Sequence, residues 1–354
     1  MQNQILTGKP VRNQSLEVFK LMASFFVVFS HVPFPGTFGG ILSCVGRFAV
    51  PLFFAVSGWF SYQADCGKLA KRFVHILKLE GIGILIMTGW SLLVHTYLGS
   101  DIRQWLLAQI PDGEQLRRWL LWNVEPFGGH LWYLSASALC YALLWGYTRL
   151  QQGKALRYGL FYGISVCLLA AHFAMDEFYT LTGILADFTV YRSGIFMGLP
   201  LFAMGMFLRQ HRQRFTATLT AGKSTLVLLF GMAVSLLEWQ IFGGRELYLG
   251  TVLTVSGMLL LASQIPDITV RFPKAGKGIS KCAAVSTAVY LLHLPVYDFY
   301  QTFLSWRFTG GLGEIIQWIL PLGVLLVSLM AAVLWTMITD RLRSRTKTRK
   351  RGNT

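Results

Sequence analysis

Long apolar stretches recur along the chain, and short polar segments rich in lysine and arginine separate them. About 20 predominantly apolar residues are what an α-helix needs to cross the hydrocarbon core of a bilayer. The pattern therefore predicts an all-α, polytopic integral membrane protein with about ten transmembrane helices. The predicted spans are residues 19–37, 47–65, 79–98, 130–149, 157–175, 192–208, 224–241, 246–263, 282–300 and 315–338.

Composition and the placement of charge agree with a membrane protein. Of the 354 residues, 54% are hydrophobic and 14% are charged, and the formal net charge is +16. A positive charge of this size also occurs in nucleic-acid-binding proteins, but here the basic residues segregate by side of the predicted membrane. Seven of the 32 lysines and arginines fall on one side: Arg47, Arg103, Arg117, Arg118, Arg192, Arg245 and Arg307. By the positive-inside rule the other side is cytoplasmic. We therefore expect no nucleic-acid partner and a multi-pass protein of a bacterial-type plasma membrane, with both termini in the cytoplasm.

A single membrane domain is expected over residues 1–340, followed by a basic cytoplasmic tail over residues 341–354. The tail carries seven basic residues, which we expect to contact anionic lipid. No small-x-small cleavage site follows the first apolar run, so its helix is expected to be retained. The five cysteines are scattered without a CxxC pair, and no disulfide framework or zinc site is expected. The sequence leaves the oligomeric state open.

The first predicted span carries two polar side chains on one face. His31 follows Lys20 by eleven residues, which is three helical turns plus about 20°. The two residues then lie about 16 Å apart along the helix. A titratable ring in a membrane helix costs free energy and usually has a function, so His31 is a candidate catalytic residue. In the plainer interpretation its ring only donates a hydrogen bond to a backbone carbonyl.

The second predicted span carries Arg47 at its outer mouth and the small pair Ser57 and Gly58 near its middle. Arg47 either takes part in a site or extends to the outer headgroups. The small pair permits the close approach of a neighbouring helix or of a thin ligand.

Four basic residues cluster where the second and third spans emerge on the inner side. Topogenic charge explains most such clusters. The alternative is a cradle for the phosphates of a cytosolic donor. The four residues are Lys68, Lys71, Arg72 and Lys78.

A second histidine falls near the middle of the bilayer in a different span. Tyr290, His293 and Tyr297 are spaced three and four residues apart and share a helical face. Measured from the inner side, His293 lies about 17 Å into the membrane. Two midplane histidines on two helices are harder to attribute to packing than one alone.

Three residues near the outer ends of other spans are weaker candidates. His130 and Trp132 begin the fourth span and either face the same cavity as His31 or belong to an aromatic belt. Glu238 is a candidate acid or partner for a cation, or a simple interfacial carboxylate.

Common catalytic motifs are absent from the sequence. It contains no HExxH, CxxC, Walker or GxSxG pattern. Metalloprotease, ATPase and ordinary hydrolase activities therefore lose support, and no metal is expected.

Four segments, taken in order, resemble the membrane-bound acyltransferase family 3: LEVFKLMASFFVVFSH, RFAVPLFFAVSGWF, HLWYL and VYLLHLPV. The resemblance extends over essentially the whole chain. It implies a ten-helix domain that transfers an acyl group, usually acetyl, from cytosolic acyl-CoA to extracytoplasmic glycans and related acceptors.

The resemblance also assigns residues. Lys20 and His31 match the basic residue and the histidine eleven positions later, with lysine where arginine is commoner. Glu17 stands where the family usually has aspartate. The remaining matches are Arg47, Ser57, Gly58, Trp132 and His293.

Together, these features predict an integral membrane O-acyltransferase that acts on a carbohydrate or other cell-envelope acceptor within the lipid bilayer. Acyl-CoA, expected to be acetyl-CoA, is the donor. The predicted catalytic set is His31, Arg47, His293, Lys20, Trp132 and Glu238, with His31 as general base and Arg47, or a group near Trp132, stabilising the oxyanion. The predicted donor-binding set is Lys68, Lys71, Arg72 and Lys78 for the CoA phosphates, and Ser57 and Gly58 for the pantetheine arm.

Two other functions remain open at this point. The same polar residues also suit a transporter or flippase for a small polar solute, such as an amino acid, or for a lipid-linked glycan. A transporter often shows a repeated pair of Gly/Pro-broken segments, which we do not find here. The other alternative is a membrane scaffold without catalytic activity.

Overall fold

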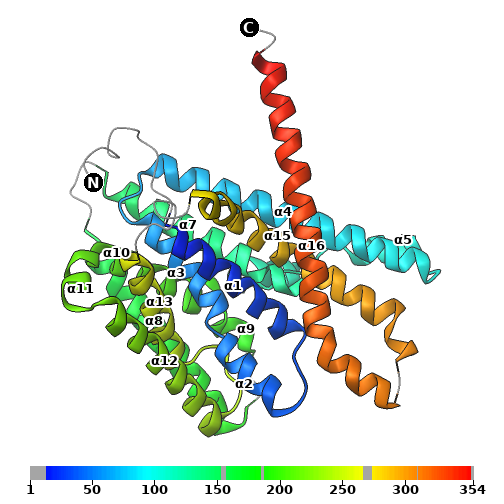
Figure 1. Ribbon diagram of the computed structural model, residues 1–354, viewed down its shortest axis with the longest axis horizontal. Helices are drawn as coiled ribbons and strands as arrows, with labels where there is room; N and C mark the ends of the chain where they lie inside the picture. The colour runs from blue at the N-terminus through cyan, green and yellow to red at the C-terminus, as the bar shows by residue number, and fades with distance from the viewer. Residues whose placement is uncertain (1–12, 153–156, 185–186, 266–272, 309, 352–354) are drawn as a thin grey trace.

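The structure is a computed structural model, and it describes residues 13–152, 157–184, 187–265, 273–308 and 310–351. Every regular element within these ranges is helical (Figure 1). The predicted cytoplasmic termini reach into residues 1–12 and 352–354, which lie outside the described residues. The helices are α1 (Gln14–His31), α2 (Gly36–Gly46), α3 (Ala49–Ser61), α4 (Cys66–Tyr97), α5 (Ile102–Ala108), α6 (Gly113–Trp122), α7 (Trp132–Leu150), α8 (Gly159–Thr182), α9 (Phe188–Tyr191), α10 (Leu199–Gln210), α11 (Arg212–Thr218), α12 (Ala221–Phe242), α13 (Leu249–Gln264), α15 (Pro273–Phe303) and α16 (Gly310–Arg351).

The all-α membrane architecture is confirmed. Within the described residues, five helical segments are long and apolar enough to cross a bilayer: α2 with α3, α4, α8, α12 and α16. Two shorter apolar helical segments, at 194–210 and in α13, add to them. The count of about ten spans stays a prediction.

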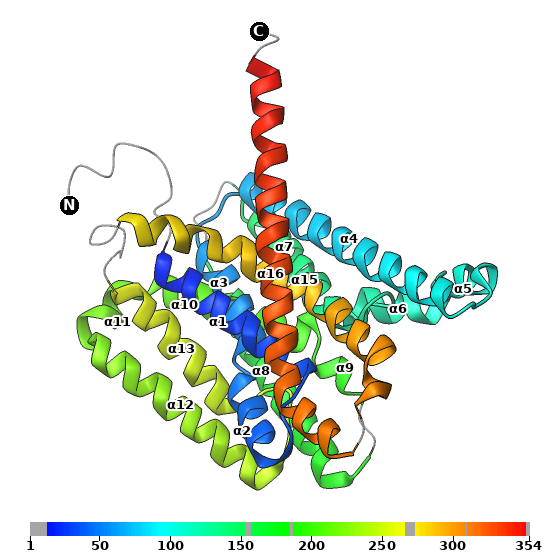
Figure 2. The same ribbon diagram turned by 45° about the vertical axis from the view of Figure 1, so that its right-hand side comes forward.

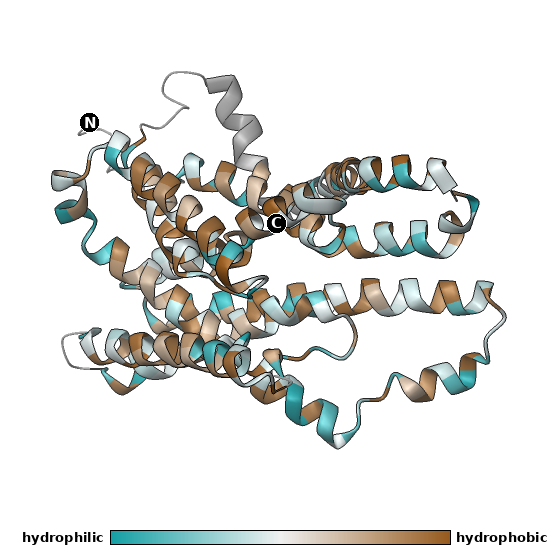
Figure 3. Cartoon of the chain, turned by 90° about the horizontal axis from the view of Figure 1, so that it is seen from below, coloured by the Kyte–Doolittle hydropathy of each residue, from teal (hydrophilic) through white to brown (hydrophobic). Residues whose placement is uncertain are grey.

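Apolar side chains also cover outward-facing surfaces, as expected where helices contact lipid. Figure 3 shows hydrophobic residues recurring along the long helices. On α12, Leu226, Phe230 and Leu237 are exposed, and on α16 so are Leu326 and Leu334. Large exposed apolar surfaces are rare on monomeric proteins in water, and helices are one of the few structures that can present them to lipid.

The first helix is shorter at its outer end than the predicted span 19–37. It begins at Gln14, where the Asn13 side chain accepts a hydrogen bond from the Leu16 amide, and it ends at His31. Val32 has φ −127° and ψ 77°, outside the helical region. The residue before a proline disfavours the helical conformation, and Pro33 follows Val32. His31 is therefore the last helical residue of α1.

Two further boundaries differ from the predicted ones. The predicted span 47–65 corresponds to α3, and α2 precedes it as a separate helix. Helix α4 begins at Cys66, well before the predicted start at residue 79, and the Asp65 carboxylate caps it by accepting the Lys68 amide. The basic cluster therefore lies on the first turns of a helix rather than in a loop.

Helix α1 occupies the centre of the bundle (Figures 1 and 2). It packs against α2, α3, α13, α15 and α16. Helix α16 continues out of the bundle through the basic segment as far as Arg351, as Figure 2 shows. Because α1 extends through the bundle, its two ends lie in two different regions of the interior.

Glycines allow the closest helix crossing beside α1. A Cβ atom on Gly58 of α3 would lie 1.8 Å from the Phe202 carbonyl oxygen of α10. A Cβ on Gly205 of α10 would lie equally close, 1.8 Å, to the Ala55 carbonyl oxygen of α3. Small residues at such crossings let membrane helices approach backbone to backbone. Gly58 therefore packs against a helix and does not line a path for a thin ligand.

Replacing Gly58 with alanine is expected to destabilise the protein, because α3 and α10 must separate to admit the methyl group. Overpacking of this kind typically costs about 1–3 kcal/mol. The matched control is Gly81→Ala on α4, where a Cβ would have no atom within 4 Å. Thermal unfolding of the purified protein in detergent should give a lower Tm for Gly58→Ala than for Gly81→Ala. Equal Tm values would contradict the proposed crossing.

Candidate active site

Two cavities lie beside the two ends of α1. The inner cavity, about 410 Å³, adjoins the first turns of the helix and includes Lys20 in its wall. The outer cavity, about 290 Å³, adjoins its last turn and includes His31. Their names follow the orientation predicted by the positive-inside rule. One helix face thus reaches both cavities, as the spacing of Lys20 and His31 predicts.

Three histidine rings gather at the outer cavity, each from a different part of the chain. The ring of His31 lies 5.1 Å from that of His293 on α15 and 6.5 Å from that of His130, between ring centroids. The rings of His130 and His293 are 5.4 Å apart. His130 belongs to a 3₁₀ turn, Gly129–Leu131, just before α7. The structure thus brings the three rings together, and His130 lines the same cavity as His31.

The three histidines differ in accessibility. His31 is exposed to the outer cavity, whereas His130 and His293 are buried at 3% and 0% exposure. The Nδ1 atom of His293 lies 2.9 Å from the Tyr290 carbonyl oxygen and 3.2 Å from that of Val289, a position from which an N–H donates. His293 thus has the kind of backbone hydrogen bond that the plainer interpretation assigned to His31. His31 and His130 both line the cavity, and His31 is the more accessible of the two.

Charged side chains from three separate segments complete the outer cavity. Arg47 forms an ion pair with Glu246, with 3.2 Å between Nη1 and Oε2. Arg192 lies 3.9 Å from the same carboxylate, and its guanidinium stacks 5.2 Å from the centre of the Trp132 ring. Two arginines therefore share one carboxylate, and the group retains a net positive charge. Arg47 lines the cavity and is not extended to the headgroups.

Arg192 and Glu246 are site residues that the sequence did not predict. Arg192 stands at the outer start of a predicted span, the same position that drew attention to Arg47, so a usable signal existed. Glu246 is 199 residues away from Arg47 in sequence, and no local pattern pairs them. Trp132 was predicted as a site residue, and in the structure its ring holds Arg192 by a cation–π contact.

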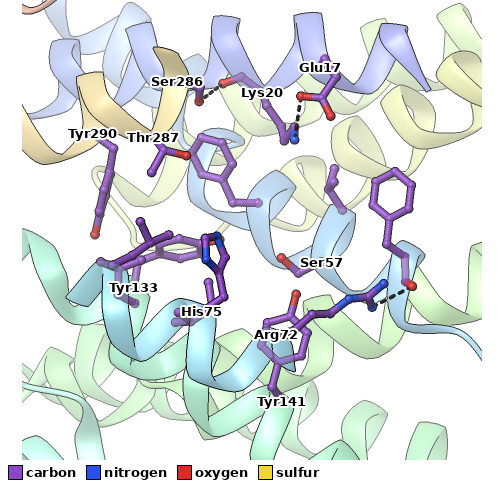
Figure 4. Close-up of a pocket in the computed structure, with 16 residues that line it drawn as sticks. Glu17, Lys20, Ser57, Arg72, His75, Tyr133, Tyr141, Ser286, Thr287 and Tyr290 are labelled. Carbon is purple, nitrogen blue, oxygen red and sulfur yellow. Dashed lines mark hydrogen bonds and ion pairs between the residues drawn. The ribbon is translucent and has the colours of Figure 1, made fainter. Parts of the chain in front are cut away.

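The inner cavity has a polar mouth (Figure 4). Lys20 Nζ lies 3.0 Å from the Glu17 carboxylate across one helical turn. Arg72 reaches from α4 to the end of α3, where it donates hydrogen bonds to the Phe60 carbonyl at 2.8 Å and to the Ser61 hydroxyl at 2.9 Å. A guanidinium has five N–H donors, so these two bonds leave others for a ligand.

Four of the predicted donor-binding residues line two neighbouring hollows in the structure. Ser57 and Arg72 line the inner cavity. Lys71 and Lys78 line a neighbouring hollow of about 360 Å³ on the outside of α4. His75, which the sequence analysis missed, belongs to the walls of both. Its spacing from Lys71 and Lys78, four and three residues, places all three on one helix face.

Lys68 and Glu238 have local partners away from the cavities. Lys68 forms an exposed ion pair with the capping residue Asp65, with 2.8 Å between the charged atoms. The Glu238 carboxylate accepts hydrogen bonds from the amides of Leu249, at 3.1 Å, and Gly250, at 2.9 Å, at the start of α13. An acid at a helix N-terminus satisfies free amides and complements the helix dipole. Glu238 thus caps a helix and lines neither cavity, so its predicted catalytic role has no structural support.

Two tyrosines belong to the walls of both cavities. They are Tyr133 of α7 and Tyr290 of α15. The Tyr290 hydroxyl donates a hydrogen bond to the His130 carbonyl oxygen. Tyr290 and His293 were predicted from their spacing to share a helix face. Tyr290 lines the inner cavity and bonds to His130, so this face of α15 extends from the inner cavity to the histidines.

The chemistry available at the outer cavity is that of a general base beside a cationic group. An accessible imidazole can take a proton from a hydroxyl group, and arginine N–H groups can stabilise an oxyanion. Within the described ranges, no group of three or more His, Cys, Asp or Glu side chains is arranged to hold a metal ion.

Comparison with known proteins agrees with this geometry. The family model of acyltransferase family 3, described as an acyltransferase domain, matches residues 13–341. No curated protein and no solved structure gives a match. The family match contains both cavities and all the site residues described above, and it extends over nearly the whole chain. This chain therefore belongs to acyltransferase family 3 and is a membrane acyltransferase.

Proposed function

We propose that the protein transfers an acyl group, normally acetyl, from cytosolic acyl-CoA to a hydroxyl group of an extracytoplasmic glycan or related cell-envelope acceptor. The observation that carries this proposal is the pair of cavities beside the two ends of α1, which meet at Tyr133 and Tyr290. Such an arrangement lets a donor and an acceptor approach one reaction point from opposite sides of the membrane.

The donor occupies the inner cavity in this proposal. CoA carries several phosphates, and arginine and lysine N–H groups bind phosphate with charge-assisted hydrogen bonds. Arg72 and Lys20 lie in the wall of the cavity, and Lys71 and Lys78 lie in the adjoining hollow. From Lys20 to His31, α1 rises about 16 Å. The extended pantetheine arm spans this gap, so the thioester reaches the tyrosines while the nucleotide stays at the inner mouth.

The acceptor occupies the outer cavity, and the reaction is a direct acyl transfer. His31 takes the proton of the acceptor hydroxyl while its oxygen attacks the thioester carbonyl carbon. A C–O bond forms, the C–S bond breaks, and the proton passes from His31 to the departing CoA thiolate. The products are an ester and free CoA. The Arg47 and Arg192 guanidinium groups face the same cavity and stabilise the oxyanion that develops on the carbonyl oxygen.

Replacing His31 with alanine is expected to lower ester formation by at least about a hundredfold, since a positioned general base contributes typically 10²–10⁴-fold. The matched control is His95→Ala at the end of α4, whose ring pairs with Ser100 and lines neither cavity. Mass spectrometry of cell-envelope glycans from cells producing each variant measures the ester, and an immunoblot of the membranes measures the amount of protein. Ester at the wild-type level from His31→Ala would exclude His31 as the base.

Replacing Arg72 with alanine is expected to raise the KM for acetyl-CoA about tenfold with little change in kcat. A hydrogen bond to a charged group contributes about 1.5–3 kcal/mol, and a phosphate contact is equally strong in the ground and transition states. Lys68→Ala is the control, because that side chain is paired with Asp65 at the surface. Transfer of labelled acetyl from acetyl-CoA to isolated cell-envelope glycans in proteoliposomes gives both constants. A fall in kcat at constant KM would place Arg72 outside the donor site.

The same proteoliposomes separate transfer from transport. A transferase binds acetyl-CoA and produces labelled glycan ester, whatever the solute gradient. If titration shows no acyl-CoA binding while a solute gradient drives uptake, the transferase proposal fails.

A further inference from the structure

The boundary between the two cavities consists of two aromatic rings. Tyr133 and Tyr290 contribute to both walls, and their ring centroids are 5.8 Å apart with the planes at 76°. In Figure 4 they lie together on one side of the inner cavity, away from Arg72. We name these two side chains the tyrosine partition.

Both members of the tyrosine partition are held in place by their surroundings. The Tyr133 ring packs against Phe53 and Phe54 of α3, at centroid distances of 5.7 Å and 4.9 Å. Tyr290 is 6% exposed, its hydroxyl donates to the His130 carbonyl oxygen, and its ring lies 5.6 Å from the His130 ring. Packed aromatic rings do not shift without loss of these contacts. The two rings are therefore held in edge-to-face contact with each other where the two cavities adjoin.

In the proposed transfer, the acyl group lies beside these two rings, because they line both cavities. The thioester arrives from the inner cavity, and its carbonyl carbon must come within reach of a hydroxyl group held at His31 in the outer cavity. The acyl chain beyond that carbon then lies against the tyrosine rings or projects into the outer cavity of about 290 Å³, which the acceptor also needs. Each added methylene competes with the rings or with the acceptor for space.

We propose that the tyrosine partition sets the length of the acyl group and restricts the donor to short-chain thioesters such as acetyl-CoA and propionyl-CoA. The proposal rests on the transfer from acyl-CoA argued above and adds the residues that select the donor. Tyr133 is the side chain to change first, because the Tyr290 hydroxyl also fixes the turn that carries His130.

The test compares donors within one protein sample. Wild-type protein and variants in proteoliposomes receive acetyl-CoA, propionyl-CoA, butyryl-CoA or hexanoyl-CoA, with isolated cell-envelope glycans as acceptor, and kcat/KM is measured for each donor. Loss of folded protein lowers every value equally and cancels in the ratio of butyryl to acetyl transfer. We expect Tyr133→Ala to raise this ratio about tenfold or more, since a difference of one methylene in a pocket changes discrimination about 10–200-fold.

Three further variants test the cause of the change. Tyr133→Phe keeps the ring and should leave the ratio at its wild-type value. Tyr133→Trp enlarges the ring and should lower propionyl transfer relative to acetyl transfer. Phe60→Ala removes an aromatic ring from the inner cavity at the end where its carbonyl binds Arg72, and it should not alter the ratio.

The possible failures are distinct. If wild-type protein forms no ester from any CoA thioester, the proposed function fails. If it forms acetyl ester but Tyr133→Ala and Tyr133→Trp keep the wild-type ratios, only the inference about the tyrosine partition is overturned. A ratio that rises equally in Phe60→Ala also overturns it, because cavity volume in general would then set the selectivity.

Discussion

Helix α1 ends at His31, just before Val32-Pro33, and the site depends on this stop. Pro33 has no amide hydrogen to extend the helix, and it disfavours the helical conformation of Val32. His31 is therefore the terminal residue of α1, and the chain turns immediately into α2. In a helix that ran on to residue 37, the side chain of His31 would be surrounded by further turns. At a helix end it is exposed to the outer cavity, and the returning chain brings Arg47 into the same wall.

The charges around the outer cavity are partly compensated, in a way that suits acyl transfer. An arginine facing a membrane interior without a partner carries a large desolvation cost. Glu246 offsets part of that cost for Arg47 and Arg192 together, and the Trp132 ring provides a further favourable contact for Arg192. One carboxylate between two guanidinium groups leaves a positive excess, which favours the transient negative charge of a tetrahedral intermediate. The same pairing fixes the arginines, so they need not reorganise when that charge develops.

The sequence predicted those features of the site that depend on local spacing. The shared face of Lys20 and His31 follows from the helical period, and the end of α1 could have been placed from Pro33 and Pro35. The neighbour of Gly58 could not be predicted. A glycine in a sequence is compatible both with a ligand beside it and with the backbone of another helix, here α10. The sequence identified the four basic residues of the cluster, but it could not show which of them face the inner cavity. Only Arg72 of the four reaches the inner cavity, since α4 is helical from Cys66 onward and its residues point to different sides.

Contacts between distant segments account for the remaining differences. Glu246 and Arg47 meet only once α2, α3 and the segment before α13 are packed, and Glu238 finds the amides of Leu249 and Gly250 only because α12 and α13 lie side by side. A lone acid at the outer end of a span therefore had two equally good interpretations in the sequence. The tertiary contacts favour a structural role, because the Glu238 carboxylate accepts hydrogen bonds from free amides at the start of α13.

The tyrosine partition also answers a requirement that any transferase of this kind must meet. A protein whose donor and acceptor come from opposite sides of a membrane needs a connection between them, yet an open connection would pass water and ions. Water at the reaction point would also hydrolyse the thioester. Two packed rings between the cavities satisfy both demands when only a short acyl group fits beside them. In the proposed mechanism, the two rings that line both cavities, Tyr133 and Tyr290, limit leakage and also select a small acyl group.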